Sequence, residues 1–485
     1  MQCSFCGGAP DRGVRLQLVC CSPECCIGAT GAAPIRYGGT SPGPVPVMRP
    51  GSGTGRSGHS LRGRPSPYRA VMSTAATEPY ERLLEAYARL VIRIGANVQV
   101  GQRVEIRGLP EQAAVARALA AEAYRVGASH VTIDYADPHL QRAQVEHAPE
   151  DMLGFVRPSQ IDAVRAWNED RPAIITLTGN PLPELMDGLD PARLAASQPV
   201  ALLREVFPLM MSGTVAWTMV AAPTPGWAAS IGVEDVARLW DAVAHAMRLD
   251  EDDPVQAWRD HIAKLKARRD ILNARGFDAV RYRGPGTDVT LGLSPSSRWA
   301  AATLESADGV EFAPNMPTEE VYFSPDWRRA EGHVRTTAPF FLPGMGTVVE
   351  DLAIGLHDGT IVGATAARGE EAVRAQLDSV ARAKHLGEVS IVDGDSRVRE
   401  TGLLFKDVLY DENVGSHIAW GNGFAFAWEN GIEMTPEQRI ESGLNQSGTH
   451  VDIVVGSPEV QIEGIGADGS VVPIVEGNEF VLRDA

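Results

Sequence analysis

The hydrophobic pattern of this 485-residue chain changes near residue 276, and this change limits the folds open to it. Up to that point, helical spacing of apolar residues alternates with short β-type runs. The expected elements are a helix from residue 79, a strand over 102–108, a helix over 111–128, a strand over 129–135, and helices over 236–249 and 254–275. A β-α-β order favours a parallel sheet with helices on its faces, so we predict an α/β domain over residues 72–275.

After residue 276 short strand patterns follow one another, and one clear helical pattern, over 370–385, interrupts them. This organisation predicts a mostly antiparallel, β-rich α+β domain over residues 276–485. The length of the chain also favours two domains over a single core. The predicted fold class is therefore an α/β N-terminal domain followed by a β-rich C-terminal domain.

The first 71 residues have a different composition, rich in Gly, Pro, Ser and Arg and without hydrophobic periodicity. Such a segment buries too little apolar surface to offset its ordering entropy, so we predict a disordered extension over 1–71. All six cysteines lie within residues 3–26, where a C-x₂-C start leaves a small zinc knuckle as an alternative. The rest of the chain has no thiol, which excludes a cysteine nucleophile there and suits a reducing cytoplasm.

The charge and hydropathy of the chain exclude two classes of partner. A formal net charge of −18 argues against a nucleic-acid surface. The most apolar run, residues 209–223, is shorter than the roughly 20 residues that span a bilayer, and we interpret it as a buried strand region. We therefore expect a cytoplasmic protein that binds neither nucleic acid nor membrane.

Candidate catalytic groups, carboxylates and imidazoles, gather in the C-terminal half: Glu319, Glu320, Glu388, His417, His450 and Asp452. Because strand side chains alternate, His450 and Asp452 face one side of their strand, and Val451 and Ile453 face the other. Carboxylate and imidazole groups are ligands for Zn, Co, Mn or Fe(II), and a surplus of carboxylates can hold two cations. Each residue alone also fits a structural role, such as a solvated strand edge or a hydrogen-bonded core histidine, so the pattern indicates only a candidate metal site.

Four motifs resemble, in order, those of the aminopeptidase T/aminopeptidase S (M29) family of metallo-aminopeptidases. They are NMPTEEVYFSPDWRRAEGHV (315–334), LGEVSIV (386–392), LLFKDVLYDENVGSHIAWGNGF (403–424) and LNQSGTHVDIVVGSPEVQIEGI (444–465). The likeness extends over residues 80–485 and includes none of residues 1–71. It implies an aminopeptidase that acts on peptides with a free N-terminus, in which two divalent ions (Zn, Co, Mn or Mg) activate a water. It also implies a homodimer.

The resemblance further implies roles for individual residues. It places the metal ligands at one glutamate of the Thr-Glu-Glu-Val run and at Glu388, His417, His450 and Asp452. We favour Glu320 as that glutamate, which leaves Glu319 as a neighbour or as a catalytic carboxylate, and the sequence leaves the choice between the two open. One position departs from the family, because Phe424 stands where the family has a tyrosine at the metal centre. A phenol can ligate a metal or donate a hydrogen bond to a developing oxyanion, and a phenyl ring can do neither.

The departure at Phe424 keeps two alternatives open. His417, His450 and Asp452 alone form the 2-His-1-carboxylate set that is typical of non-haem Fe(II) oxygenases. The same family scaffold resembles certain ring-cleaving dioxygenases of hydroxypyridine breakdown, so a dioxygenase of this type is one alternative. A catalytically inactive binding protein is the other alternative. The presence of Glu320 and Glu388 favours the hydrolase, since a mononuclear iron site does not need them.

Overall fold

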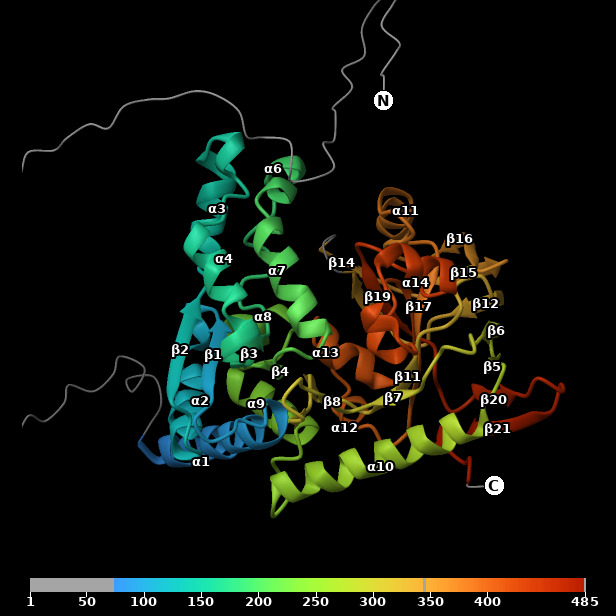
Figure 1. Cartoon of the computed structure of the whole chain (residues 1–485), viewed down its shortest axis with the longest axis horizontal. Coiled ribbons are helices and arrows are strands. Elements are labelled where there is room, and N and C mark those ends of the chain that lie inside the picture. Colours follow the sequence, from blue (N-terminus) through green and yellow to red (C-terminus); the bar gives the residue numbers. More distant parts are fainter. Residues whose placement is uncertain (1–73, 343–345, 484–485) are drawn as a thin grey trace, which may run out of the picture. The chain divides into compact units, whose positions relative to one another are not determined.

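The computed structural model of the chain describes residues 74–342 and 346–483. Within this range the chain combines one parallel sheet, which has helices on both faces, with a five-stranded and an eight-stranded antiparallel sheet (Figure 1). The predicted disordered extension over 1–71 and the alternative of a zinc knuckle at 3–26 lie outside the described residues.

The parallel sheet has five strands, and every neighbouring pair in it is parallel. In spatial order they are β10 (Asn315–Met316), β4 (Trp217–Ala221), β3 (Ala173–Thr178), β1 (Arg103–Gly108) and β2 (His130–Tyr135). The helix α2 (Ala113–Arg125) connects β1 to β2, whose register pairs Arg103 with His130. The predicted β-α-β unit is confirmed.

Helices cover both faces of this sheet because its side chains alternate between two apolar clusters. On β3, Ile175 belongs to the same buried cluster as Leu119 of α2 and Trp240, whereas Ile174 belongs to a separate cluster with Val206 and Trp217. The helices of this region are α1 (Thr74–Leu90), α2, α3 (Pro138–His147), α4 (Pro158–Arg165), α5 (Trp167–Asp170), α6 (Pro191–Ala196), α7 (Val200–Met211), α8 (Pro225–Ser230), α9 (Val236–Ala246) and α10 (Pro254–Arg275).

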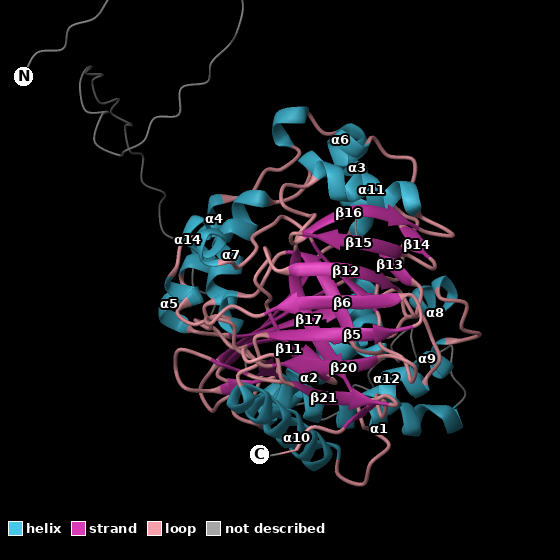
Figure 2. Cartoon of the chain, turned by 90° about the vertical axis from the view of Figure 1, so that its right-hand side faces the viewer, coloured by secondary structure: helices cyan, strands magenta, loops and turns pink. Residues whose placement is uncertain are grey.

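Most strands after residue 276 form antiparallel sheets, as predicted, but β10 pairs in parallel with β4 and joins the first sheet. A five-stranded sheet has the order β19 (His450–Val454), β18 (His417–Gly421), β17 (Leu386–Val392), β11 (Glu320–Phe323) and β7 (Ala300–Ala301). An eight-stranded sheet has the order β16 (Thr360–Thr365), β15 (Ala353–His357), β12 (Ala330–Arg335), β6 (Thr287–Gly292), β5 (Ala279–Gly284), β20 (Gln461–Ile465), β21 (Val471–Glu476) and β22 (Glu479–Phe480). Figure 2 shows the strands from β16 to β21 in this order from top to bottom.

Short elements complete the described chain. The strands β13 (Phe340–Leu342) and β14 (Thr347–Val349) form one hairpin, and β8 (Leu304–Glu305) and β9 (Glu311–Phe312) form another. The later helices are α11 (Glu370–Ser379), α12 (Arg397–Glu400), α13 (Val408–Asp411) and α14 (Pro436–Ser442). A 3₁₀ turn, Glu412–Val414, continues directly from α13.

Two sequence expectations differ from the structure. The helix predicted over 370–385 ends at Ser379, and Arg382 then takes a left-handed backbone (φ 59°) that a right-handed helix cannot contain. The apolar run 209–223 is split between the end of α7 and β4, and Gly213 makes the turn between them at φ 70°. None of the described helices is both long and apolar enough to cross a membrane.

The two antiparallel sheets share one apolar core. Phe323, Ile391 and Ile453, on one face of the five-stranded sheet, belong to the same buried cluster as Val289 and Leu291 of β6. Tyr282 of β5 also donates a hydrogen bond to the backbone carbonyl of Ser390, at 2.8 Å. One face of the five-stranded sheet is therefore committed to packing, which leaves the opposite face for polar groups. The domain boundary near residue 276 stays a prediction.

Candidate metal centre

The candidate ligands share one face of the five-stranded sheet. Paired residues of antiparallel strands point to the same side, and the register pairs Ser390 with His417 and places Ala419 between Glu388 and Asp452. Glu320 lies two residues before Tyr322, which pairs with Ser390. The alternation therefore places Glu320, Glu388, His417, His450 and Asp452 together, opposite the apolar face.

Backbone carbonyls orient both histidines. Nδ1 of His417 lies 3.1 Å from the carbonyl oxygen of Gly415, and Nδ1 of His450 lies 2.8 Å from that of Asn422. A carbonyl can only accept, so each Nδ1 must donate. Each Nε2 therefore faces the shared site, and in the neutral ring it has a lone pair free for a metal.

The five side chains form two groups that share Glu388. In the first group, Glu320, Glu388 and His417 bring one ligand atom each to within 4.8 Å of one another. In the second group, Glu388, His450 and Asp452 do the same. Nε2 of His417 lies 3.1 Å from Oε2 of Glu320, and Nε2 of His450 lies 3.0 Å from Oε2 of Glu388.

Several atoms of these groups are buried without a hydrogen bond to any described residue. They are Nε2 of His417 and both carboxylate oxygens of Asp452. Nε2 of His417 and Oδ1 of Asp452 each have an oppositely charged neighbour without a directed hydrogen bond, Glu320 at 3.1 Å and Nε2 of His450 at 3.2 Å. A buried polar atom without a hydrogen bond costs free energy, and a cation coordinated by these atoms would remove that cost. Oxygen and imidazole donors without sulfur also suit divalent first-row metals, so the residues present fit a metal site.

The electrostatics of the site show a shortage of positive charge. Burial, reinforced by the charge of Glu320, raises the pKa of Glu388 to about 7. Burial acts to lower the pKa of His417, but pairing with Glu320 overcomes it and raises that pKa to about 10. Without metal, these buried carboxylates therefore retain protons or draw protons onto the histidines, as expected for groups that lack a cation.

Glu319 lies outside both groups. Its Oε1 is 2.8 Å from Nη1 of Arg248, and its Oε2 is 3.3 Å from Nε2 of His261 on α10. Burial lowers the pKa of His261 to about 4, so Arg248 is the cationic partner at neutral pH. This arrangement does not support the prediction that Glu319 moves a proton in the reaction, because its carboxylate is committed to Arg248.

Phe424 lies beside the second group. Its ring centroid is 4.9 Å from that of His450, and its backbone N–H donates to Oγ of Ser324 at 2.8 Å. Its ring also stacks on Phe426 at 5.1 Å and meets Tyr322 edge to face at 5.7 Å. The family resemblance implies a tyrosine at this position. Phe424 therefore places an apolar ring beside the candidate metal centre, where a phenol was expected.

Sequence reasoning missed three polar residues at this site. Ser390 donates from Oγ to Oε2 of Glu320 at 2.5 Å, which orients that carboxylate. Glu412 begins the 3₁₀ turn after α13, and burial together with the charge of Asp452 raises its pKa well above the usual range. Tyr322 experiences the charges of Glu320, Glu388 and Glu412. The two-residue spacing of Ser390 from Glu388 and of Tyr322 from Glu320 was the available signal, because it places both on the face of the ligands.

Comparison with known proteins identifies the family. The family described as Thermophilic metalloprotease (M29) matches residues 80–480. The chain belongs to the M29 family of thermophilic metalloproteases. The chain is 36% identical over 411 residues to aminopeptidase PepS from Streptococcus thermophilus, an alignment that covers 83% of this chain and 99% of PepS. Its fold matches wild-type AmpT from Thermus thermophilus with a TM-score of 0.76 at 34% identity, covering 83% of this chain and all of AmpT.

Membership of the M29 family confirms the resemblance expected from the four motifs, and it implies the use of a divalent metal. A 2,5-dihydroxypyridine dioxygenase from Pseudomonas putida matches with a TM-score of only 0.46 at 12% identity, covering 83% of this chain and 98% of the dioxygenase. That likeness is too remote to support a function.

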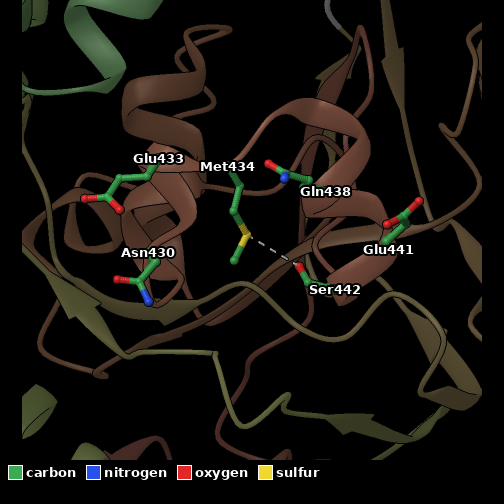
Figure 3. A pocket seen from close by; sticks show the side chains of 6 residues that line it. All are labelled: Asn430, Glu433, Met434, Gln438, Glu441 and Ser442. Carbon is green, nitrogen blue, oxygen red and sulfur yellow. Dashed lines mark hydrogen bonds between the residues drawn. The ribbon is translucent and has the colours of Figure 1, made fainter.

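A hollow of about 500 Å³ in this M29 protein is lined by none of the candidate ligands (Figure 3). Its lining comes from the segment that follows Phe424 and from α14: Asn430, Glu433, Met434, Gln438, Glu441 and Ser442. Oγ of Ser442 points to Sδ of Met434 at 3.9 Å. Because no candidate ligand lines this hollow, we assign it no part in the chemistry.

Proposed function

We propose that this protein is a metal-dependent aminopeptidase that hydrolyses the N-terminal peptide bond of peptides. The supporting observation is the pair of ligand groups that share Glu388. A shared carboxylate between two three-residue groups is the arrangement expected for two ions about 3.5–4 Å apart. Relatives with 33–36% identity over most of the chain are named aminopeptidases, which fits this assignment.

In this proposal Glu320 and His417 would hold one divalent ion, His450 and Asp452 would hold the other, and Glu388 is the candidate ligand common to both groups. When bound, the ions supply a water of lowered pKa and polarise the scissile carbonyl. Gly415 and Asn422 keep the two imidazoles in the Nδ1–H tautomer through their carbonyls. Ser390 holds Glu320 in place. The candidate ions in this proposal are Zn, Co, Mn and Mg, as in the sequence analysis.

We assign the proton transfers to Glu412. The water oxygen forms a bond to the carbonyl carbon, the C=O π pair moves onto the carbonyl oxygen, and Glu412 accepts the proton that the water loses. An electron pair of the oxyanion then re-forms the C=O bond as the C–N bond breaks, the pair of the C–N bond stays on nitrogen, and Glu412 returns the proton to the leaving amine. Bound cations would lower the pKa of Glu412 from its raised value and make it a base near neutral pH.

The carboxylates of the site also favour a substrate with a free amino terminus. Glu320, Glu388, Asp452 and Glu412 gather around only two imidazoles. Their negative charge favours an amine or ammonium group near the scissile bond, which an internal peptide segment does not have. We expect exopeptidase rather than endopeptidase activity for this reason.

The direct test combines metal analysis of the purified protein with hydrolysis of aminoacyl-p-nitroanilides under added Co or Zn. Two equivalents of metal, hydrolysis of the free-amine substrate and no hydrolysis of its N-acetylated form are expected. A single equivalent of iron, with oxygen uptake and no hydrolysis, would instead support the dioxygenase alternative. Bound metal without turnover would support an inactive binding protein.

Two further expectations belong to this proposal. We propose a homodimer, to be tested by light scattering coupled to size-exclusion chromatography, and a monomer at micromolar concentration would contradict it. We also propose a cytoplasmic location, since the described chain contains no cysteine and the protein is acidic overall. Fractionation of cells that express the full chain would test the location.

A further inference from the structure

We propose that Tyr322 supplies the phenol that Phe424 lacks and donates a hydrogen bond to the oxyanion that develops on the scissile carbonyl. This inference rests on the proposed aminopeptidase function. It names Tyr322 as a catalytic residue on the strand that provides Glu320, and it explains how a site with Phe424 beside His450 keeps a phenolic donor.

The position of Tyr322 in the sheet places its side chain at the site. Tyr322 follows Glu320 by two residues on β11, so both side chains leave the same face. The register aligns Tyr322 with Ser390 on β17, and Ser390 with His417 on β18. Tyr322 therefore stands in the same row as a candidate ligand and beside the serine that orients Glu320.

The surroundings of the Tyr322 ring combine charge with apolar contacts. Burial, reinforced by the charges of Glu320, Glu388 and Glu412, raises the pKa of its phenol well above the usual range. The ring meets Phe424 edge to face at 5.7 Å and Phe426 at 6.3 Å. Since Phe424 in turn lies against His450 at 4.9 Å, the two rings border the same centre and only Tyr322 has a hydroxyl.

The Tyr322 hydroxyl is free to act. The residue is 9% exposed, its hydroxyl makes no hydrogen bond to a described residue, and that hydroxyl is not among the fully buried atoms that lack a partner, so a bound substrate can reach it. Tyr87 and Tyr282, which are also buried, instead donate to the backbone carbonyls of Ala221 and Ser390. An oxyanion formed during the reaction would accept a hydrogen bond from the Tyr322 hydroxyl.

The backbone holds the Tyr322 and Phe424 rings together. The N–H of Phe424 donates to Oγ of Ser324, two residues after Tyr322, at 2.8 Å. This bond ties the loop after β18 to the end of β11, so the two aromatic positions form one wall. A phenol on either ring would border the same reacting centre, which makes an exchange of the hydroxyl between the two positions testable.

The experiment compares three variants of the zinc-loaded protein: Tyr322→Phe, Phe424→Tyr and the double variant. We expect Tyr322→Phe to lower kcat for leucyl-p-nitroanilide by about 10²-fold with little change in KM, as for the loss of one oxyanion donor. Phe424→Tyr alone should change kcat by less than about threefold, because a phenol is already present. The kcat of the double variant should be at least tenfold higher than that of Tyr322→Phe.

Binding measurements give a readout independent of turnover. The phosphonic acid analogue of leucine resembles the tetrahedral oxyanion, whereas leucine itself does not. Tyr322→Phe should weaken calorimetric binding of the phosphonate by at least tenfold and leave leucine binding and zinc content unchanged. Tyr87→Phe, which removes a buried tyrosine hydroxyl that donates to the carbonyl of Ala221 on β4, is the matched control and should alter neither affinity.

The outcomes separate this inference from the proposed function. If the wild-type protein hydrolyses the anilide but Tyr322→Phe matches it in kcat and phosphonate affinity, the role of Tyr322 is wrong and the aminopeptidase assignment stands. A Tyr322→Phe protein that loses leucine binding and zinc together with activity would show a structural role and would also overturn the inference. If the wild type neither hydrolyses the anilide nor binds the phosphonate, both proposals are wrong.

Discussion

Glu319 and Glu320 are adjacent in the chain, but their carboxylates serve different parts of the structure. Glu320 accepts a hydrogen bond from Ser390 and lies 3.1 Å from Nε2 of His417. Glu319 instead pairs with Arg248 at 2.8 Å, and its backbone N–H donates to Oδ1 of Asn413 at 2.7 Å. One carboxylate of this pair therefore belongs to the candidate metal centre, and the other anchors the start of β11 to the helical region.

Replacement of each carboxylate of this pair by the amide should give opposite results. Glu319→Gln leaves the charge of Arg248 buried without a partner, so the free energy of unfolding should fall by about 3–5 kcal/mol while metal content is retained. Glu320→Gln should leave the fold intact and lower kcat/KM by on the order of 10²-fold or more. Urea denaturation and steady-state kinetics of the two variants check this. Loss of metal from Glu319→Gln with unchanged stability would contradict it.

The sharing of Glu388 predicts how many ions each ligand variant retains. Glu388→Ala removes a group common to both sites, so bound metal should fall from two equivalents to nearly none. Asp452→Asn alters only the second group and should leave one equivalent. Elemental analysis after dialysis against trace metal measures both. Glu476→Gln, an exposed carboxylate on β21 that belongs to none of the candidate ligand groups, serves as the control. If Glu388→Ala keeps one tightly bound ion, the two sites do not share this residue.

Removal of the proposed proton carrier should affect the rate more than binding. Glu412→Gln keeps the size of the side chain but cannot accept a proton, so kcat should fall by about 10²–10⁴-fold while zinc content and KM stay close to wild type. Stopped assays from pH 5 to 9 should also lose the acidic limb of the kcat profile. Glu433→Gln, on the lining of the separate hollow, is the control. An unchanged kcat would rule out Glu412 as the base.

The metal-free protein should become less stable as the pH rises. The pKa of Glu388 is raised to about 7 in the folded state, above its unfolded value of about 4.3. Its contribution to the free energy of unfolding is therefore complete below about pH 4.3 and is lost as the pH rises to 7. His417, raised to about 10, loses its contribution between about pH 6.5 and 10. In chelated protein, we expect the titration of each group to lower the free energy of unfolding by on the order of 1–3 kcal/mol.

Denaturant titrations of chelated and zinc-loaded protein at pH 5, 7 and 9 measure this dependence. Zinc should abolish the decrease between pH 5 and 7, because the cation compensates the charge on Glu388. Asp411, whose pKa burial also raises to about 7, titrates in the same range. Glu388→Gln should therefore reduce the slope in chelated protein and leave the part due to Asp411. Stability that rises between pH 5 and 7 would contradict the prediction.

Local patterns in the sequence were sufficient to predict much of the fold. The alternation of helices and strands before residue 276 predicted a parallel sheet, and β1, α2 and β2 confirm it. The two-residue period of a strand predicted that His450 and Asp452 share a face. These predictions succeed because periodicity depends only on residues that are close in the chain.

The remaining features depend on contacts between segments far apart in the sequence. Which of Glu319 and Glu320 faces the candidate centre is set by Arg248 and α10 on one side and by Ser390 of β17 on the other. The shared role of Glu388 follows from the pairing of β17 with both β11 and β18. Strand register and helix docking are properties of the packed chain, so the sequence alone indicated the candidate ligands while the tertiary structure determined how they meet.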